Sequence, residues 1–306
     1  MDNEPSWTIS PSCLLEPRCW PYLDRSRSAS SACNADRLGI INNAELRNVT
    51  LYDLGVLQLR TRRFGDADEK LHAVAESGTN SQELFTALGQ AALLVNPRDT
   101  QSATESASVI ERVGEAESLS AQKQFAGAEE IYKTLSKQAP DFPNLHFAYG
   151  RMLLEARKKD EAIKEFRREL QRDPKNVNSM LEIASVEYEQ DAADGLTYAE
   201  KAVRLAPELP FAHYMLGMLR LQTADPTGAI PELEIVRQAF PRQPTIYYSL
   251  GNAYARVGQK AEAARACAEF SRLNAQAKSS QPDLSNEQAY GFSDRRIWIE
   301  QDKQTQ

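Results

Sequence analysis

The chain has 306 residues, and 42% of them are hydrophobic, which is enough for a continuous core. Its 36 basic and 43 acidic residues are largely interspersed and give a net charge of −7, so we expect no nucleic-acid ligand, which would need a concentrated positive face. No apolar run approaches the about 20 residues that span a bilayer. The acidic start does not resemble an export signal, so a cytoplasmic location is the default expectation.

Residues 1–42 predict a disordered leader, because they combine prolines and a serine cluster with no helical periodicity. Trp7 and Trp20 are unusual in such a segment; they reflect chance, a misplaced start or a short partner-docking motif. Cys13, Cys19 and Cys33 also lie here. Their spacing does not match common zinc sites and no histidine is near, so we expect no metal site.

Residues 43–95 predict the first helices of the chain. Leu51 and Leu54 lie at helical spacing in one predicted helix. After a basic turn, Ala67 and Leu71 lie at helical spacing in a second. Leu88-Gly89 follows Leu54-Gly55 by 34 residues and predicts another first helix from about residue 81. Residues 96–108 are polar and contain Pro97, so we expect an irregular connection there and an orphan helix before it.

Residues 109–275 predict five tandem helix pairs. Four prolines recur at intervals of 34, 33 and 34 residues: Pro140, Pro174, Pro207 and Pro241. Four small residues repeat the same intervals: Gly150, Ala184, Gly217 and Gly251. A period near 34 indicates a solenoid in which each amphipathic pair buries its apolar face on the next. The P-x-x-P junctions are interpreted as helix ends and starts, because proline cannot continue a helix but fits its first position.

Residues 276–306 predict a flexible tail, which is polar at first and then contains the apolar run 297–299. Ala275 stands where a proline would close the last helix, so that helix could continue. The apolar run could cover the end of the array or dock on a neighbouring copy, which leaves self-association open.

Together these columns of small residues and prolines resemble the tetratricopeptide repeat over about residues 48–275. The small residues that resemble those of the family's first helix are Gly55, Gly89, Ala116, Gly150, Ala184, Gly217 and Gly251. Those that open the second helix are Ala67, Ala128, Ala162, Gly195, Ala229 and Ala263. The resemblance implies an all-α fold, a right-handed superhelical solenoid of antiparallel helix pairs.

The resemblance also implies a function. Tetratricopeptide arrays are binding scaffolds whose first helices line a concave groove, so a protein or peptide partner is expected here. By that resemblance the groove residues would be Asn144, Phe147, Arg151, Leu154, Asn178, Leu181, Tyr188, Phe211, Tyr214, Met218, Tyr248 and Asn252. Their aromatic members would supply large contact areas at low entropic cost.

An enzyme is the less favoured reading, and we expect no catalytic residue and no cofactor. His72, His146 and His213 lie in separate predicted helices and are interpreted as packing or rim residues. Cys267 falls in the column of Tyr132 and is interpreted as a buried structural thiol. Alternative functions are a regulatory or assembly subunit of a larger enzyme or secretion complex, or a self-associating scaffold.

Overall fold

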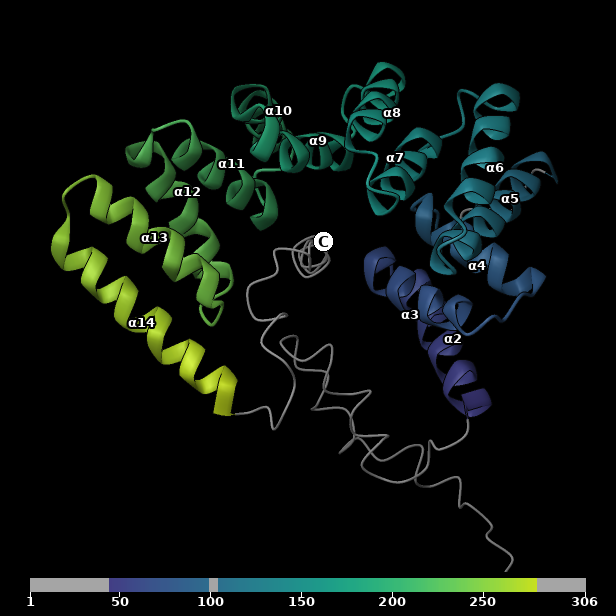
Figure 1. The fold of residues 1–306 in the computed structure, drawn as a ribbon, viewed down its shortest axis with the longest axis horizontal. Coiled ribbons are helices and arrows are strands. Elements are labelled where there is room, and N and C mark those ends of the chain that lie inside the picture. The colour runs from purple at the N-terminus through teal and green to yellow at the C-terminus, as the bar shows by residue number, and fades with distance from the viewer. Residues whose placement is uncertain (1–43, 99–103, 280–306) are drawn as a thin grey trace, which may run out of the picture. The chain divides into compact units, whose positions relative to one another are not determined.

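The computed structural model describes residues 44–98 and 104–279, and within these ranges it consists of helices without strands (Figure 1). The helices are α2 (Ala44–Arg60), α3 (Phe64–Glu76), α4 (Gln82–Ala92), α5 (Thr104–Ala121), α6 (Phe125–Gln138), α7 (Leu145–Glu155), α8 (Lys159–Arg172), α9 (Val177–Gln190), α10 (Ala192–Leu205), α11 (Pro210–Gln222), α12 (Pro226–Ala239), α13 (Pro244–Arg256) and α14 (Lys260–Ser279). The predicted all-α class is confirmed. The expected leader and the expected tail beyond Ser279 lie outside the described residues.

Consecutive helices pack as antiparallel pairs, and each pair stacks on the next (Figure 1). The pairs from α7–α8 to α13–α14 repeat this arrangement. The packing contacts place the residues from Leu51 onward in one compact unit, whose boundary after Thr50 falls within α2. Small residues permit the close approach: a Cβ added at Gly217 would lie 2.9 Å from Leu233 Cγ, and one at Gly150 would lie 2.5 Å from Phe166 Cε1. The columns of small residues therefore mark the points where paired helices touch.

The prolines delimit the helices as the sequence predicts at two of the three P-x-x-P junctions; at the third, α7 begins at Leu145, two residues after Pro143. Pro210 and Pro244 are the first residues of α11 and α13, and α10 and α12 end just before Pro207 and Pro241. Between α9 and α10 a single residue suffices, because Asp191 ends one helix and caps the other. Its carboxylate accepts the N–H groups of the next helix's first turn, as helix-capping residues do.

The helix α4 has a partner, which differs from the orphan helix expected from the sequence. It packs along α5, which begins at Thr104, inside the stretch expected to be irregular. A Cβ at Gly89 would lie 1.9 Å from the Ile110 carbonyl oxygen, and one at Gly114 would lie 1.6 Å from that of Phe85. The two backbones are in direct contact because glycine stands at both crossing points.

The last described helix, α14, continues past Ala275 to Ser279. Among the residues that the structure describes, no helix is long and apolar enough to cross a membrane.

Candidate partner-binding site

Four of the twelve residues predicted to line a groove are buried in the packing of the array. They are Phe147, Leu181, Phe211 and Tyr214. Phe147 lies against Phe166 of its own pair, with ring centroids 6.1 Å apart, and the other three belong to the core cluster around α9, α10, α11 and α12. These side chains stabilise the array and present little surface to a partner.

Two more of the predicted residues bond to earlier parts of the array. The Asn144 side chain donates to the Leu93 carbonyl at 2.9 Å and accepts from Asn176 Nδ2 at 2.8 Å. Arg151 Nη2 donates to Asp68 Oδ2 at 2.9 Å, across 83 residues of sequence. Both polar groups are therefore engaged within the chain.

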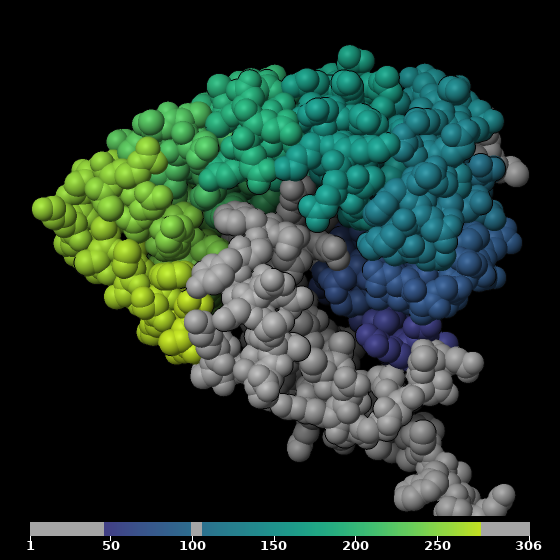
Figure 2. Space-filling view, viewed as in Figure 1, coloured from purple at the N-terminus to yellow at the C-terminus, as the bar shows by residue number. Residues whose placement is uncertain are grey.

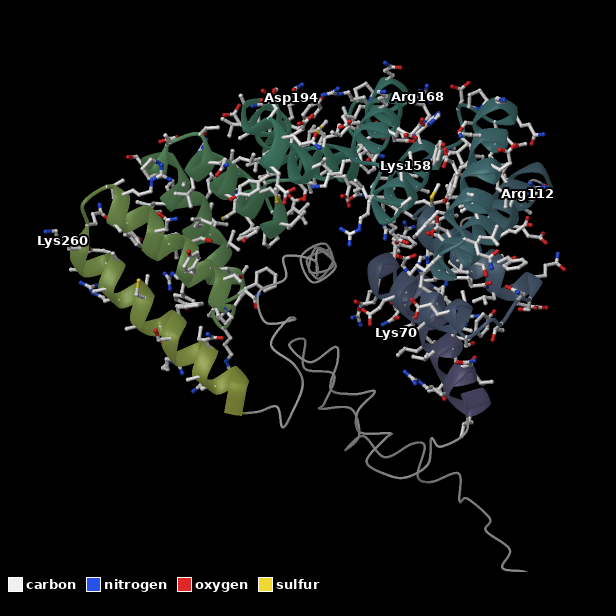
Figure 3. All side chains as sticks on the ribbon, in the orientation of Figure 1. Lys70, Arg112, Lys158, Arg168, Asp194 and Lys260 are labelled. Carbon is white, nitrogen blue, oxygen red and sulfur yellow. The ribbon has the colours of Figure 1, made fainter. Side chains whose placement is uncertain are left out.

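The remaining six have accessible surface on the first helices. Leu154, Asn178, Tyr188 and Met218 are partly buried, and Tyr248 and Asn252 are exposed. The second helices carry a different, charged surface, on which Arg168 of α8 and Asp194 of α10 are labelled in Figure 3. Arg167 joins this surface by its ion pair with Asp194 at 2.8 Å. Apolar and amide side chains are thus available on the first helices, and ion pairs on the second.

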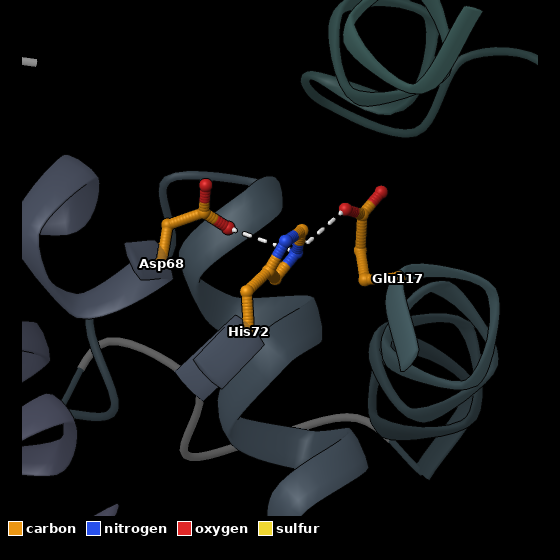
Figure 4. A group of neighbouring side chains, drawn as sticks. All are labelled: Asp68, His72 and Glu117. Carbon is orange, nitrogen blue, oxygen red and sulfur yellow. Dashed lines mark hydrogen bonds and ion pairs between the residues drawn. The ribbon is translucent and has the colours of Figure 1, made fainter. Parts of the chain in front are cut away.

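A buried polar network connects α3, α5, α6 and α7, and sequence reasoning did not identify it. His72 Nε2 lies 3.2 Å from Glu117 Oε2 and 3.5 Å from Asp68 Oδ1 (Figure 4). The Tyr132 hydroxyl donates to the other Glu117 oxygen, and Arg151 pairs with Asp68. The only sequence signal was the i,i+4 spacing of Asp68 and His72, which is common on helices.

The charges of this network balance each other. Burial lowers the pKa of His72, but the facing Asp68 and Glu117 carboxylates outweigh it and raise that pKa to about 9. The Asp68 carboxylate raises the pKa of Arg151 further above its usual range, and burial together with Glu117 raises that of Tyr132. Two cations therefore face two carboxylates at neutral pH.

Asp68, His72 and Glu117 bring three potential metal-ligating atoms within 4.8 Å of one another. A metal ion would require the neutral, unprotonated imidazole of His72 as its ligand. It would also compete with Arg151 for Asp68 and with Tyr132 for Glu117. The donor set does not fit a cation site, and it is better described as a neutralised network that joins the helices.

The other two histidines occupy equivalent places in their units and act as packing residues, as the sequence predicts. His146 Nδ1 lies 2.7 Å from Glu165 Oε2, and His213 Nδ1 lies 2.6 Å from Glu232 Oε2. The second nitrogen of His213 bonds the Pro207 carbonyl at 2.7 Å. His146 lines a cavity of about 800 Å³ between α6, α7 and α8. Sequence reasoning did not predict this cavity.

Cys267 is exposed, and its assignment as a buried structural thiol is wrong. The Sγ atom lies 3.0 Å from the position of a Cβ added at Gly251, so it does occupy the expected column. The equivalent Tyr132 and Phe166 are fully buried because another helix pair follows each of them. Within the described residues no pair follows α14.

Comparison with known proteins agrees with this architecture. The family model described as tetratricopeptide repeat matches residues 113–177 and 214–277. A crystal structure of MamA protein, 18% identical, covers 60% of this chain and 100% of its own, with a TM-score of 0.53. A second MamA structure, 19% identical, covers 54% of this chain and 97% of its own, with a TM-score of 0.51.

A crystal structure of YrrB, a TPR protein with an unusual peptide-binding site, is 17% identical to this chain. It covers 56% of this chain and 92% of its own, with a TM-score of 0.50. No curated protein sequence matches the chain. At these identities the structures share the fold, and the family model locates the repeats. Residues 113–177 and 214–277 of this chain are therefore similar to tetratricopeptide repeats, and they lie within an all-α array whose fold is similar to that of MamA.

Proposed function

We propose that the array is a non-catalytic scaffold that holds a protein or peptide segment along its first helices. One observation carries the proposal: accessible side chains recur at two repeat positions on these helices. The residue directly after the small residue of the first helix is Ser185, Met218 or Asn252. The residue three positions later in the same helix is Leu154 or Tyr188. A partner lying across the first helices would meet both rows.

The chemistry of these rows suits an amphipathic segment. Met218 can adapt to varied apolar side chains, and Tyr188 offers a large contact area with a polar end. Asn178 and Asn252 can bond a partner's backbone or amide groups. The peptide-binding site named for YrrB is a precedent for a tetratricopeptide array in this role.

The test compares two surfaces of the same protein. The double change Tyr188→Ala and Met218→Ala removes the apolar anchors of the first helices, and Ile235→Ala removes an exposed apolar side chain from the second helix α12. We expect the double variant to lose at least tenfold in affinity for a partner captured by the parent chain, as is typical for anchor residues. The Ile235 variant should bind like the parent.

Circular dichroism of both variants establishes that helicity is retained. Unchanged binding by the folded double variant, or an equal loss in the Ile235 variant, would contradict the assignment of the first helices as the binding surface.

A further inference from the structure

The last helix pair leaves open a face that is closed in the pairs α7–α8, α9–α10 and α11–α12. In the column of Tyr248, the earlier residues Phe147, Leu181 and Tyr214 are at most 4% exposed, whereas Tyr248 is 62% exposed. Tyr248 contacts Phe270 of α14, with ring centroids 5.6 Å apart. The open face thus begins with an aromatic pair at the junction of α13 and α14.

Two columns of α14 show the same change. The residues equivalent to Cys267 are all fully buried: Leu71, Tyr132, Phe166, Ala199 and Leu233. Those equivalent to Phe270 are also buried: Val74, Leu135, Glu169, Ala202 and Val236. Cys267 is exposed and Phe270 is partly exposed. We call the surface of Tyr248, Cys267 and Phe270 the tail face. In Figure 2 the yellow atoms belong to α14, the last described helix.

The first helix has the complementary opening. Leu57 of α2 is 56% exposed, whereas its equivalents in the later first helices are at most 3% exposed: Ala91, Ser118, Met152, Val186, Leu219 and Ala253. Asp53, one turn earlier on the same side, is also exposed. Glu182 occupies the equivalent position of α9 inside the array, so a carboxylate is tolerated at this position. We call the surface of Asp53 and Leu57 the head face.

Inside the chain, the columns of both faces are buried where successive pairs meet. The first helix of each pair packs on the pair before it, as α11 does on α10 and α13 on α12. Leu219 Cδ2, in the column of Leu57, lies 3.1 Å from the position of a Cβ added at Gly195 of the preceding pair, and Tyr149 of α7 stacks on Tyr132, in the column of Cys267, with ring centroids 5.1 Å apart. The same interface that joins successive pairs is therefore left unfilled at both ends of the described array.

We propose that the tail face binds the head face of a second copy of this chain, so that α2 of one copy continues the array of another. Continuity with the interface used throughout the array identifies the occupant, because within the described residues no first helix follows the tail face, and the head face belongs to a first helix. Such a head-to-tail contact uses two different surfaces, so it builds open chains or rings rather than a closed twofold dimer.

The test uses sedimentation of the full-length chain over a range of concentrations. The parent chain should assemble beyond a dimer as concentration rises. Leu57→Asp blocks the head face and Tyr248→Asp blocks the tail face, and each variant alone should sediment as a monomer. Both residues are exposed, so helicity should persist and is checked by circular dichroism. Ile235→Asp, at an exposed site on α12, is the matched control and should assemble like the parent.

Mixing the two blocked variants gives the sharpest result. One retains an intact tail face and the other an intact head face, so the mixture should form a dimer and nothing larger. A parent chain that stays monomeric would overturn the proposal. Assembly that persists in either blocked variant would also overturn it. A mixture that stays monomeric while the parent assembles would overturn it too, and would assign the tail face to a different occupant.

Discussion

At the scale of single residues, the role of a side chain in this array depends on which neighbouring helix covers it. The column of Phe147, Leu181, Tyr214 and Tyr248 has the aromatic or aliphatic character expected of a binding groove. Three of these side chains are buried and only the last is exposed. The sequence alone could identify the column, but it could not tell how deeply each copy is covered, because this depends on the pair that follows.

The glycines at the α4–α5 crossing should be the least replaceable small residues of the chain. In Gly114→Ala the new methyl group would meet the Phe85 backbone, which cannot move aside as a side chain can. We expect a loss of about 3 kcal/mol in the free energy of unfolding, at the upper end of overpacking costs. Urea denaturation followed by circular dichroism measures it.

The control for this change is Gly127→Ala in α6, where the new methyl group would lie 3.3 Å from the flexible end of Leu119. Alanine favours helix by about 1 kcal/mol over glycine. The control should therefore be neutral or slightly stabilising. Similar losses in both variants would argue against a backbone contact between α4 and α5.

At the scale of helices, the sequence predicted the regular pairs and not the irregular ones. Repeating small residues and prolines predicted five regular pairs over residues 109–275, because each unit meets the same packing requirement. The α4–α5 contact escaped prediction because Gly114 lies two residues before the repeat's own small residue, Ala116. The Asp68–Arg151 ion pair joins helices 83 residues apart and leaves no local pattern.

The network of Asp68, His72 and Glu117 should make the α3–α5 junction sensitive to pH. The pKa of His72 is raised from 6.5 to about 9 in the folded chain, so its protonation favours folding. This contribution is complete below pH 6.5 and is lost as pH rises through about 9. The shift corresponds to about 3 kcal/mol.

An NMR titration of the three histidines measures the pKa directly, and His72→Gln assigns the signal. In the same variant, the loss of stability between pH 6.5 and 9 should disappear, because glutamine can donate to Glu117 but does not titrate in this range. A His72 signal that titrates near 6.5 would show that the carboxylates do not hold its proton.

At the scale of the whole molecule, the period of the sequence was sufficient for the fold class, and the family model and similar structures agree with it. The binding surface was less predictable. Asn144 and Arg151 were assigned to the groove by their column, but Leu93 and Asp68, from earlier units, engage them. Leu154, Tyr188, Met218 and Asn252 are the residues on which the proposed function now rests.

Site-specific photo-crosslinking tests that function most directly. A photoreactive side chain would replace Ser185 on a first helix in one protein and Lys201 on a second helix in another. If the first helices hold the partner, the first protein should crosslink a specific protein or peptide and the second should not. Equal crosslinking from both sites, or crosslinking only from residue 201, would contradict the account.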